Sequence, residues 1–144
     1  MQITRQADYA LRAMLYLAQI EPNKRAATSQ IAVDRRIPSS FLAKIISQLS
    51  IAGLIHTSRG ARGGVSLARS PEEISILEVV EAIDGPLSLN DCTASPENCP
   101  FGSDCTLRPL WCDAQAELVQ RLRNTNFAQF LPTQAPVSML QTQN

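Results

Sequence analysis

Three cysteines stand close together in the second half of the chain, in a stretch without helical or strand periodicity. Cys92, Cys99 and Cys105 are separated by six and then five residues, with Pro96 and Pro100 among them. Three thiolates on one aperiodic loop can wrap a soft metal centre, and iron–sulfur clusters are held by cysteine thiolates. The paired C-x2-C knuckles that structural zinc sites usually show are absent. The loop therefore predicts an iron–sulfur site, with zinc or unliganded thiols as the alternatives.

Two further residues with metal-binding side chains lie outside this loop. Cys112 follows Trp111, seven residues after Cys105, and the single histidine, His56, falls in a stretch with a strand pattern. Free cysteine is among the most buried residue types, so we expect Cys112 to be buried against a helix interface. We expect Trp111 in the core and no chemistry at His56.

Two short helices joined by a tight turn are predicted in the first half of the chain. Thr28 or Ser29 would cap the first helix; Ser39 or Ser40 would cap the second, which stops at Gly53. The apolar face of the second helix consists of Phe41, Leu42, Ile45, Ile46 and Leu49. Two helices joined by so short a turn indicate a helix-turn-helix.

A β-hairpin is predicted directly after the second of these helices. Two apolar, β-branched runs at 54–58 and 65–68 flank a glycine-rich tip that carries Arg59 and Arg62. A hairpin in this place is the wing of a winged helix. The sequence therefore predicts a winged helix-turn-helix.

Three longer amphipathic helices complete the prediction. They are expected at 4–20, between Ile74 and Ile83, and from Leu107 to about Phe130. The fold class is mainly α, with a β-hairpin wing and a long C-terminal helix. The chain is expected to divide into a DNA-binding domain at 1–86, a cysteine loop at 87–106, the long helix at 107–131 and a disordered tail at 132–144.

The charge is unevenly divided along the chain. Thirteen Lys and Arg balance thirteen Asp and Glu in the whole chain. Residues 1–69, however, hold ten basic and three acidic side chains, whereas residues 70–144 hold three basic and ten acidic ones. A basic helix-turn-helix with a basic wing indicates DNA binding. Ser39, Ser40 and Lys44 would contact bases in the major groove, and Arg59 and Arg62 would reach an adjacent minor groove.

The chain resembles the bacterial Rrf-type winged-helix transcription regulators from about Met1 to Leu131. The resemblance rests on DYALRA at 8–13, KIISQL at 44–49, the wing RGARGG at 59–64, and the cysteine triplet followed by Leu107-Arg108. It implies a homodimeric regulator, a repressor that binds palindromic double-stranded DNA, with 107–131 as the dimerisation helix. It also implies an iron–sulfur cluster near the dimer interface, [4Fe–4S] favoured over [2Fe–2S], that senses nitric oxide, redox state or iron–sulfur status.

The resemblance also implies candidates for a fourth cluster ligand beside the three loop cysteines. Nitric-oxide-sensing (NsrR-like) members use an aspartate in the first helix of the partner subunit, and Asp8 matches it. Iron–sulfur-assembly (IscR-like) members use a histidine where this chain has Arg108. Ala43 also matches the nitric-oxide-sensing subfamily. Cys112 departs from both patterns and is the alternative fourth ligand. In that case the carboxylate of Asp8 would only stabilise the positive, N-terminal end of its helix.

Two rival functions compete with a cluster-controlled regulator. One is a metal-free repressor that senses thiol oxidation; the other is a cysteine-based redox enzyme, which the absence of a C-x-x-C motif and of a cofactor-binding glycine loop disfavours. The first residues show no cationic leader, and no apolar run approaches the roughly 18 residues of a membrane span. We therefore expect a cytoplasmic protein with reduced thiols and no membrane partner.

Overall fold

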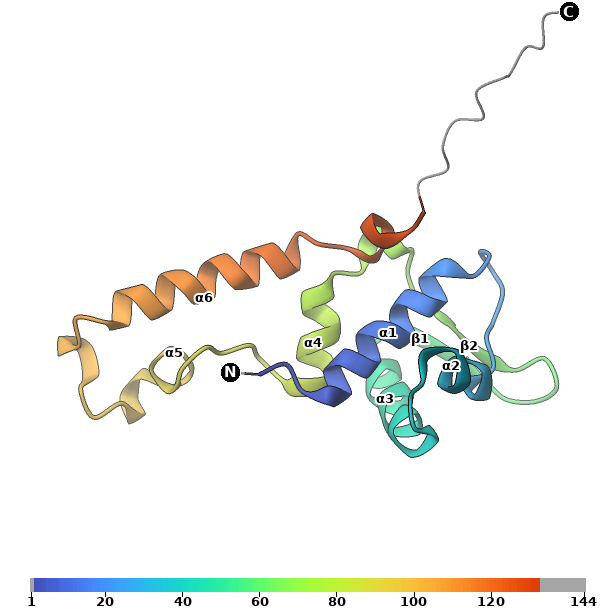
Figure 1. Ribbon diagram of the computed structural model, residues 1–144, viewed down its shortest axis with the longest axis horizontal. Helices are drawn as coiled ribbons and strands as arrows, with labels where there is room; N and C mark the ends of the chain where they lie inside the picture. The colour runs from blue at the N-terminus through green and yellow to red at the C-terminus, as the bar shows by residue number, and fades with distance from the viewer. Residues whose placement is uncertain (1, 133–144) are drawn as a thin grey trace, which may run out of the picture.

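Helices make up most of the chain, and they form a winged-helix body and an arm that projects from it (Figure 1). The computed structural model describes residues 2–132. Its helices and strands are α1 (Arg5–Gln19), α2 (Thr28–Arg35), α3 (Ser39–Ile51), β1 (Ile55–Ser58), β2 (Gly64–Leu67), α4 (Ile76–Asp84), α5 (Asp91–Ala94) and α6 (Arg108–Arg123). Short 3-10 helices lie at Pro71–Glu73, Pro96–Asn98, Gly102–Asp104 and Phe127–Phe130. The predicted fold class, mainly α with a hairpin wing, is confirmed.

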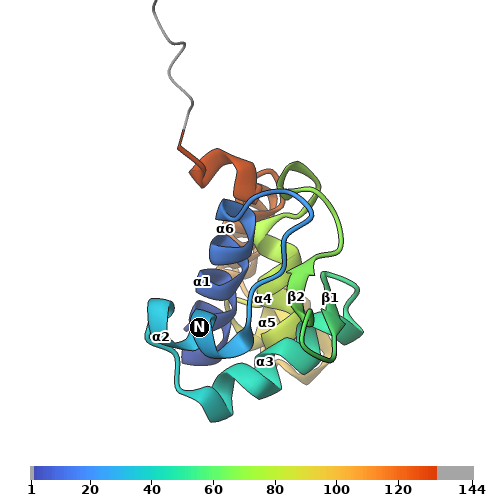
Figure 2. The ribbon, with the colours of Figure 1, turned by 90° about the vertical axis from the view of Figure 1, so that its right-hand side faces the viewer.

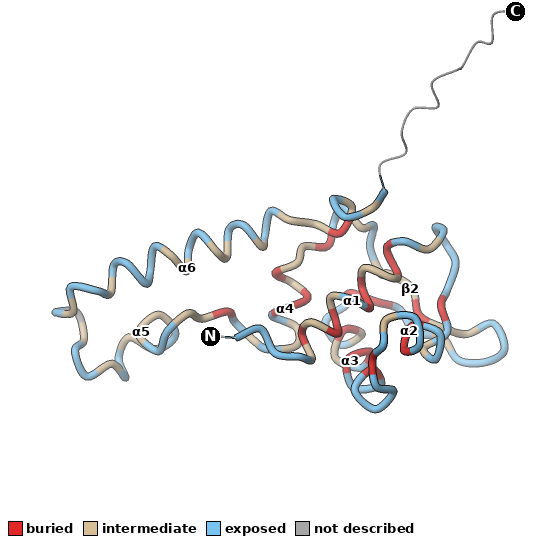
Figure 3. Tube along the Cα trace, in the orientation of Figure 1, coloured by how far each residue is buried: buried red, intermediate tan, exposed pale blue. Residues whose placement is uncertain are grey.

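Helix α1 is the centre of the body, and α2, α3 and α4 pack around it (Figures 1 and 2). Thr4 caps its start by accepting a hydrogen bond from the Ala7 amide at 3.1 Å. Ala10, Ala13 and Met14 are fully buried, and small alanines allow close approach of neighbouring helices. Most buried residues of the body belong to one core cluster, and Leu77, Val80 and Leu87 form a second, smaller cluster beside α6; buried residues are red in Figure 3.

The helix-turn-helix forms as predicted, but its helices are capped differently. Ala27 and Pro38 occupy the two N-cap positions, and neither helix has a side-chain cap bond. The predictions of Thr28 or Ser29 and of Ser39 or Ser40 as caps were therefore wrong. Burial of Leu42, Ile45, Ile46 and Leu49 holds α3 in place without a cap.

The wing is a two-stranded antiparallel hairpin whose register pairs Ile55 with Leu67 and Ser58 with Gly64. Val65 is buried and also pairs with Ala26, which precedes α2. A Cβ on Gly64 would lie 2.7 Å from the carbonyl oxygen of Ala26, so this close approach requires glycine. The base of the wing is thereby fixed to the helix-turn-helix.

The C-terminal helix is shorter than predicted. Helix α6 ends at Arg123 rather than near Phe130, because the following residues turn back to the body. Phe127 lies in the core with 2% of its surface exposed, and its amide donates to the carbonyl of Ile74. The last residues of the predicted dimerisation segment thus belong to the winged-helix core. The predicted disordered tail lies, from residue 133 on, outside the described residues.

Helix α6 and the cysteine loop form the arm, which projects away from α2, α3 and the wing (Figure 1). None of the sixteen residues of α6 is buried. The prediction that Trp111 is a core residue was wrong: it is 37% exposed, because the tip of the arm lies beyond the body. Between residues 2 and 132, no helix has both the length and the apolar character of a membrane span.

Candidate DNA interface and cysteine loop

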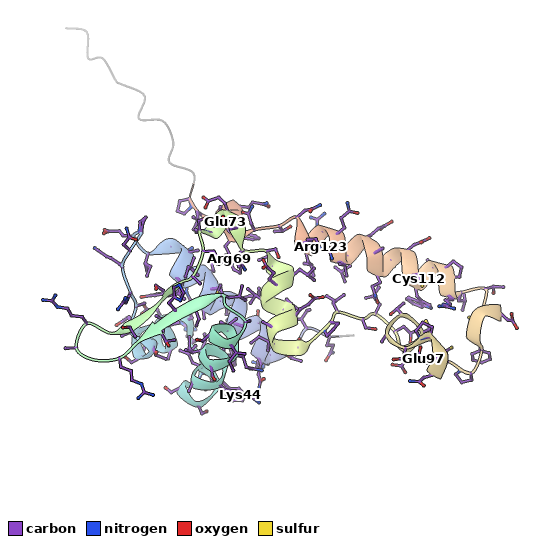
Figure 4. The ribbon with its side chains drawn as sticks, turned by 180° about the vertical axis from the view of Figure 1, so that it is seen from behind. Lys44, Arg69, Glu73, Glu97, Cys112 and Arg123 are labelled. Atoms are coloured by element: carbon purple, nitrogen blue, oxygen red, sulfur yellow. The ribbon has the colours of Figure 1, made fainter. Side chains whose placement is uncertain are left out.

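The solvent face of α3 carries the residues predicted to contact bases. Ser39, Ser40 and Lys44 are all exposed, because they lie opposite the buried leucine and isoleucine face of the helix. Figure 4 shows Lys44 on the outer side of α3. Since neither serine caps the helix, both hydroxyls are available to another partner. The exposed Ala43 and Ser47 extend the same face.

The tip of the wing carries the two predicted arginines beside this face. Arg59 and Arg62 are exposed in the loop between β1 and β2. Gly60 has φ +99°, and a Cβ on Gly63 would lie 2.4 Å from the carbonyl oxygen of Ser58, so the tight tip needs both glycines. The tip therefore holds two cations on a constrained loop.

An open hollow of about 600 Å³ lies between α3 and the wing. Its lining includes the hydroxyls of Ser47, Ser50 and Thr57, together with Arg59. Hydroxyls and arginine are groups that proteins place against DNA phosphates. The ion pairs between residues 2 and 132 are Arg12–Asp8, Lys24–Glu21 and Arg69–Glu78, so none involves Lys44 or the wing arginines.

The three loop cysteines lie at the far end of the arm. Cys92 is in α5, while Cys99 and Cys105 follow the 3-10 helices Pro96–Asn98 and Gly102–Asp104. All three are free thiols and half-buried. The amide of Leu89 donates to Gln115 on α6 at 3.0 Å, which holds the start of the loop beside the helix.

The loop does not assemble a metal site within one chain. In the part of the chain that the structure describes, no three Cys, His, Asp or Glu side chains lie close enough to hold a metal. The donor chemistry nevertheless fits an iron–sulfur cluster, since three unpaired thiols stand on one loop whose regular elements are all short helical turns. The loop would have to close around the cluster to bring these thiols together.

Asp8 and Cys112 are the two candidates for a fourth ligand. Asp8 lies in the first turn of α1, where its carboxylate is half-exposed and accepts from the Arg12 guanidinium at 2.9 Å. Cys112 lies near the start of α6 on the arm (Figure 4), and its thiol is exposed in the single chain. Cys112 is therefore not buried by contacts within its own chain, and its predicted burial would need a partner. His56 is exposed on β1, the strand predicted for it.

Comparison with known proteins assigns this arrangement to a family. Residues 3–133 match Rrf2, a family described as iron-dependent transcriptional regulators. The chain belongs to the Rrf2 family. Regulators of this family bind DNA, so this Rrf2 protein is a DNA-binding transcriptional regulator and not an enzyme.

This Rrf2 protein is similar in sequence to one regulator and in structure to two others. The HTH-type transcriptional regulator NsrR of Shouchella clausii (strain KSM-K16) is 38% identical over 123 residues, 85% of this chain and 83% of that protein. CymR (YrzC), the global cysteine regulator of B. subtilis, has a TM-score of 0.77 at 24% identity, covering 90% of this chain and 95% of that chain. T. potens IscR has a TM-score of 0.72 at 22% identity, and the match covers 90% of this chain and 85% of that chain. At these identities the two solved structures support the fold alone.

One surface of the Rrf2 protein was missed by sequence reasoning. An apolar hollow of about 590 Å³ lies between α1, the end of α6 and the 3-10 helix Phe127–Phe130. Its lining includes Leu11, Leu15, Leu122 and Phe130, with Arg12 and Arg121. The pattern of each helix alone does not reveal it, because residues of α1, α4, α6 and the 3-10 helix together form its walls.

Proposed function

We propose that this Rrf2 regulator is a homodimeric repressor whose DNA affinity is controlled by an iron–sulfur cluster. Cys92, Cys99 and Cys105 would hold the cluster, with [4Fe–4S] favoured over [2Fe–2S]. The observation that carries the proposal is the gathering of three free, half-buried thiols in one loop at the end of the arm. The iron dependence in the description of the family supports it.

The uncovered face of α6 supports a homodimer. Leu107, the N-cap residue of α6, and Leu110 in its first turn are 59% and 58% exposed at the tip of the arm, three residues apart. An apolar surface that its own chain leaves uncovered is typical of a subunit interface. The apolar hollow beside α1 is a second uncovered surface, and it lies near the other end of α6.

An antiparallel pairing of two α6 helices would bring these two surfaces together. Leu110 and Arg121 are eleven residues apart, which is about 16 Å along a helix. A two-fold axis near the middle of α6 would therefore place Leu110 of each subunit at the hollow of the other.

The same pairing supports Asp8 of the partner subunit as the fourth ligand. Leu11 and Arg12 line the hollow, and Asp8 precedes them by one turn of α1. Docking of the arm tip there would carry the cysteine loop toward that carboxylate. Cys112, on the same arm, is the alternative, and it needs no partner subunit.

The DNA-binding surface of each subunit would consist of α3 and the wing. Ser39, Ser40 and Lys44 would contact base edges, and Arg59 and Arg62 would enter the minor groove. The hollow between α3 and the wing, with its hydroxyl groups, would receive the sugar–phosphate backbone that separates the two grooves. A symmetric dimer carries two such surfaces and so requires a palindromic operator.

Control would arise from the position of the arm. When bound, the cluster supplies a site that reacts with nitric oxide or oxygen. The three cysteines would brace the loop against the body of the partner subunit, which sets the separation of the two α3 helices. Half-sites must be spaced by whole turns of DNA, so a small change in that separation lowers operator affinity. We place the regulator in the cytoplasm, where thiols stay reduced.

The cluster itself is tested by purification without oxygen. We expect a brown protein with absorbance near 400 nm and about four irons per chain, or about two for [2Fe–2S]. Cys92→Ser, Cys99→Ser and Cys105→Ser should each abolish the colour, whereas Cys112→Ser should keep it if Asp8 is the ligand. A colourless, iron-free wild-type protein after reconstitution with iron and sulfide would contradict the proposal.

A metal-free thiol sensor is the second candidate. It is favoured by one observation: the described thiols are unpaired and form no metal site within the chain. Such a repressor would bind DNA without iron and lose affinity on treatment with hydrogen peroxide. Recovery of that affinity with dithiothreitol, in protein that holds no iron, would support this candidate over the cluster.

A further inference from the structure

The turn between α2 and α3 contains an arginine in a backbone conformation that suits other residues better. Arg36 has φ 53° and ψ 47°, in the left-handed region, where an L side chain crowds the backbone. Its amide donates to the carbonyls of Ala32 and Val33, and the amide of Ile37 donates to Ala32 at 2.9 Å. Glycine, and next asparagine, is the usual residue at such a helix end. The backbone therefore does not explain why an arginine stands here.

The side chain of Arg36 has no structural partner. It is exposed, and within residues 2–132 it takes part in no ion pair or side-chain hydrogen bond. The neighbouring Arg35 differs: its guanidinium lies 5.4 Å from the centre of the Tyr16 ring and donates to Gln19. Of two adjacent arginines, one ties α2 to α1 and the other faces solvent.

Arg36 lies at the end of α3 that would enter the DNA. It precedes the exposed Ser39 and Ser40 by three and four residues. When the first turn of a recognition helix enters the major groove, the residues just before it pass the edge of the groove, where the phosphates run. An arginine guanidinium binds phosphate through two parallel N–H donors.

We propose that Arg36 binds a backbone phosphate at the edge of the major groove and thereby fixes how far α3 enters it. The strained backbone of the free protein is retained because of the contact that the side chain makes in the complex. This contact adds to those of Ser39, Ser40 and Lys44. It rests on the DNA binding shared by the family and does not depend on the iron–sulfur cluster.

Two substitutions separate the charge of Arg36 from its backbone. Arg36→Asn removes the charge but suits the left-handed conformation, so its Tm should rise by about 3 °C. Its affinity for a short duplex, selected from a random-sequence pool by the wild-type protein, should fall about tenfold at 0.1 M salt. The slope of log affinity against log salt should decrease by about one unit, because one phosphate is no longer neutralised. Arg36→Lys should keep the wild-type slope.

The control is Arg123→Ala, which removes one exposed positive charge on the arm. It should leave affinity and slope nearly unchanged. Wild-type affinity and slope in Arg36→Asn would overturn the inference, as would an equal loss of affinity in Arg123→Ala, which would reveal a general charge effect. A lower Tm of Arg36→Asn would overturn the argument from strain.

The measurements are made with cluster-loaded and cluster-free protein. We expect Arg36→Asn to bind the duplex more weakly than the wild type in both forms. If wild-type affinity does not change when the cluster is removed, the proposed control by the cluster fails, while the Arg36 comparison still decides the phosphate contact.

Discussion

The guanidinium of Arg12 holds the carboxylate of Asp8 one turn earlier along α1, with 2.9 Å between Arg12 Nη2 and Asp8 Oδ2. Both side chains are about half exposed, so this ion pair contributes little to the stability of the fold. In the single chain the Asp8 carboxylate nevertheless has a partner, the Arg12 guanidinium. To bind the cluster, the carboxylate would have to leave this ion pair and bind iron.

Substitution of Asp8 tests this exchange. Asp8→Asn should leave the Tm nearly unchanged, because the ion pair is exposed, but should speed bleaching of the cluster absorbance under air or a chelator. Arg12→Gln should slow the bleaching, since it frees the carboxylate for iron. Equal bleaching rates for Asp8→Asn and the wild type would assign the fourth position to Cys112, or to a ligand from solution.

The wing arginines should determine much of the electrostatic part of DNA binding. The double variant Arg59→Ala, Arg62→Ala should weaken binding to a selected duplex and flatten its salt dependence by up to about two units of slope. Titrations at several salt concentrations measure this. The control removes two charges elsewhere, in Arg5→Ala, Arg123→Ala. If the wing variant binds like this control, the wing lies outside the interface.

The apolar tip of the arm should decide the oligomeric state. Leu110→Glu places a charge on the exposed face of α6 and should convert the dimer into a monomer that stays folded, because Leu110 contributes nothing to the core of its own chain. Sedimentation equilibrium and circular dichroism measure the two properties. Val33→Glu, on an exposed apolar side chain of α2, is the matched control and should remain dimeric. A dimeric Leu110→Glu variant would argue against the α6 pairing.

Glu78 should contribute to acid sensitivity. Burial raises the pKa of its carboxyl, but hydrogen bonds from the Ser75 amide and from Arg69 outweigh burial, so the pKa lies below its usual 4.5. The ionised form therefore stabilises the fold above pH 4.5, and this contribution is lost as the pH falls through the lowered pKa.

The comparison of Tm between pH 7 and pH 3 tests the role of Glu78. Glu78→Gln should lose less Tm on acidification than the wild type, because the neutral amide keeps the cap at Ser75 without titrating. The exposed Glu72, whose carboxylate forms no ion pair within residues 2–132, provides the control Glu72→Gln. Identical acid profiles for Glu78→Gln and the wild type would show that another group dominates.

Periodicity was sufficient to predict the body of the fold. The spacing of Leu42, Ile45 and Leu49 selects one buried face of α3, and the glycines at 60, 63 and 64 fit a tight hairpin. These features are local, since they depend on the helical repeat and on backbone crowding. The exposed faces that carry Lys44 and the wing arginines follow directly from them.

The features that sequence reasoning missed depend on contacts between distant segments. Phe127 looks like a continuation of a helix, yet it is buried against residues near Ile74, so α6 ends early. Trp111 looks like core because tryptophan is usually well buried, but the arm extends it past the body. The hollow beside Leu11 belongs to no single element and had no signal in the sequence.

The most direct measurement compares the affinity of one selected duplex for the same protein with its cluster intact and with its cluster removed, both prepared without oxygen. The account predicts a difference of at least tenfold, which corresponds to about 1.4 kcal/mol between the two forms. Nitric oxide added to the loaded protein should move its affinity toward that of the cluster-free form. Equal affinities for the loaded and cluster-free proteins would contradict control by the cluster.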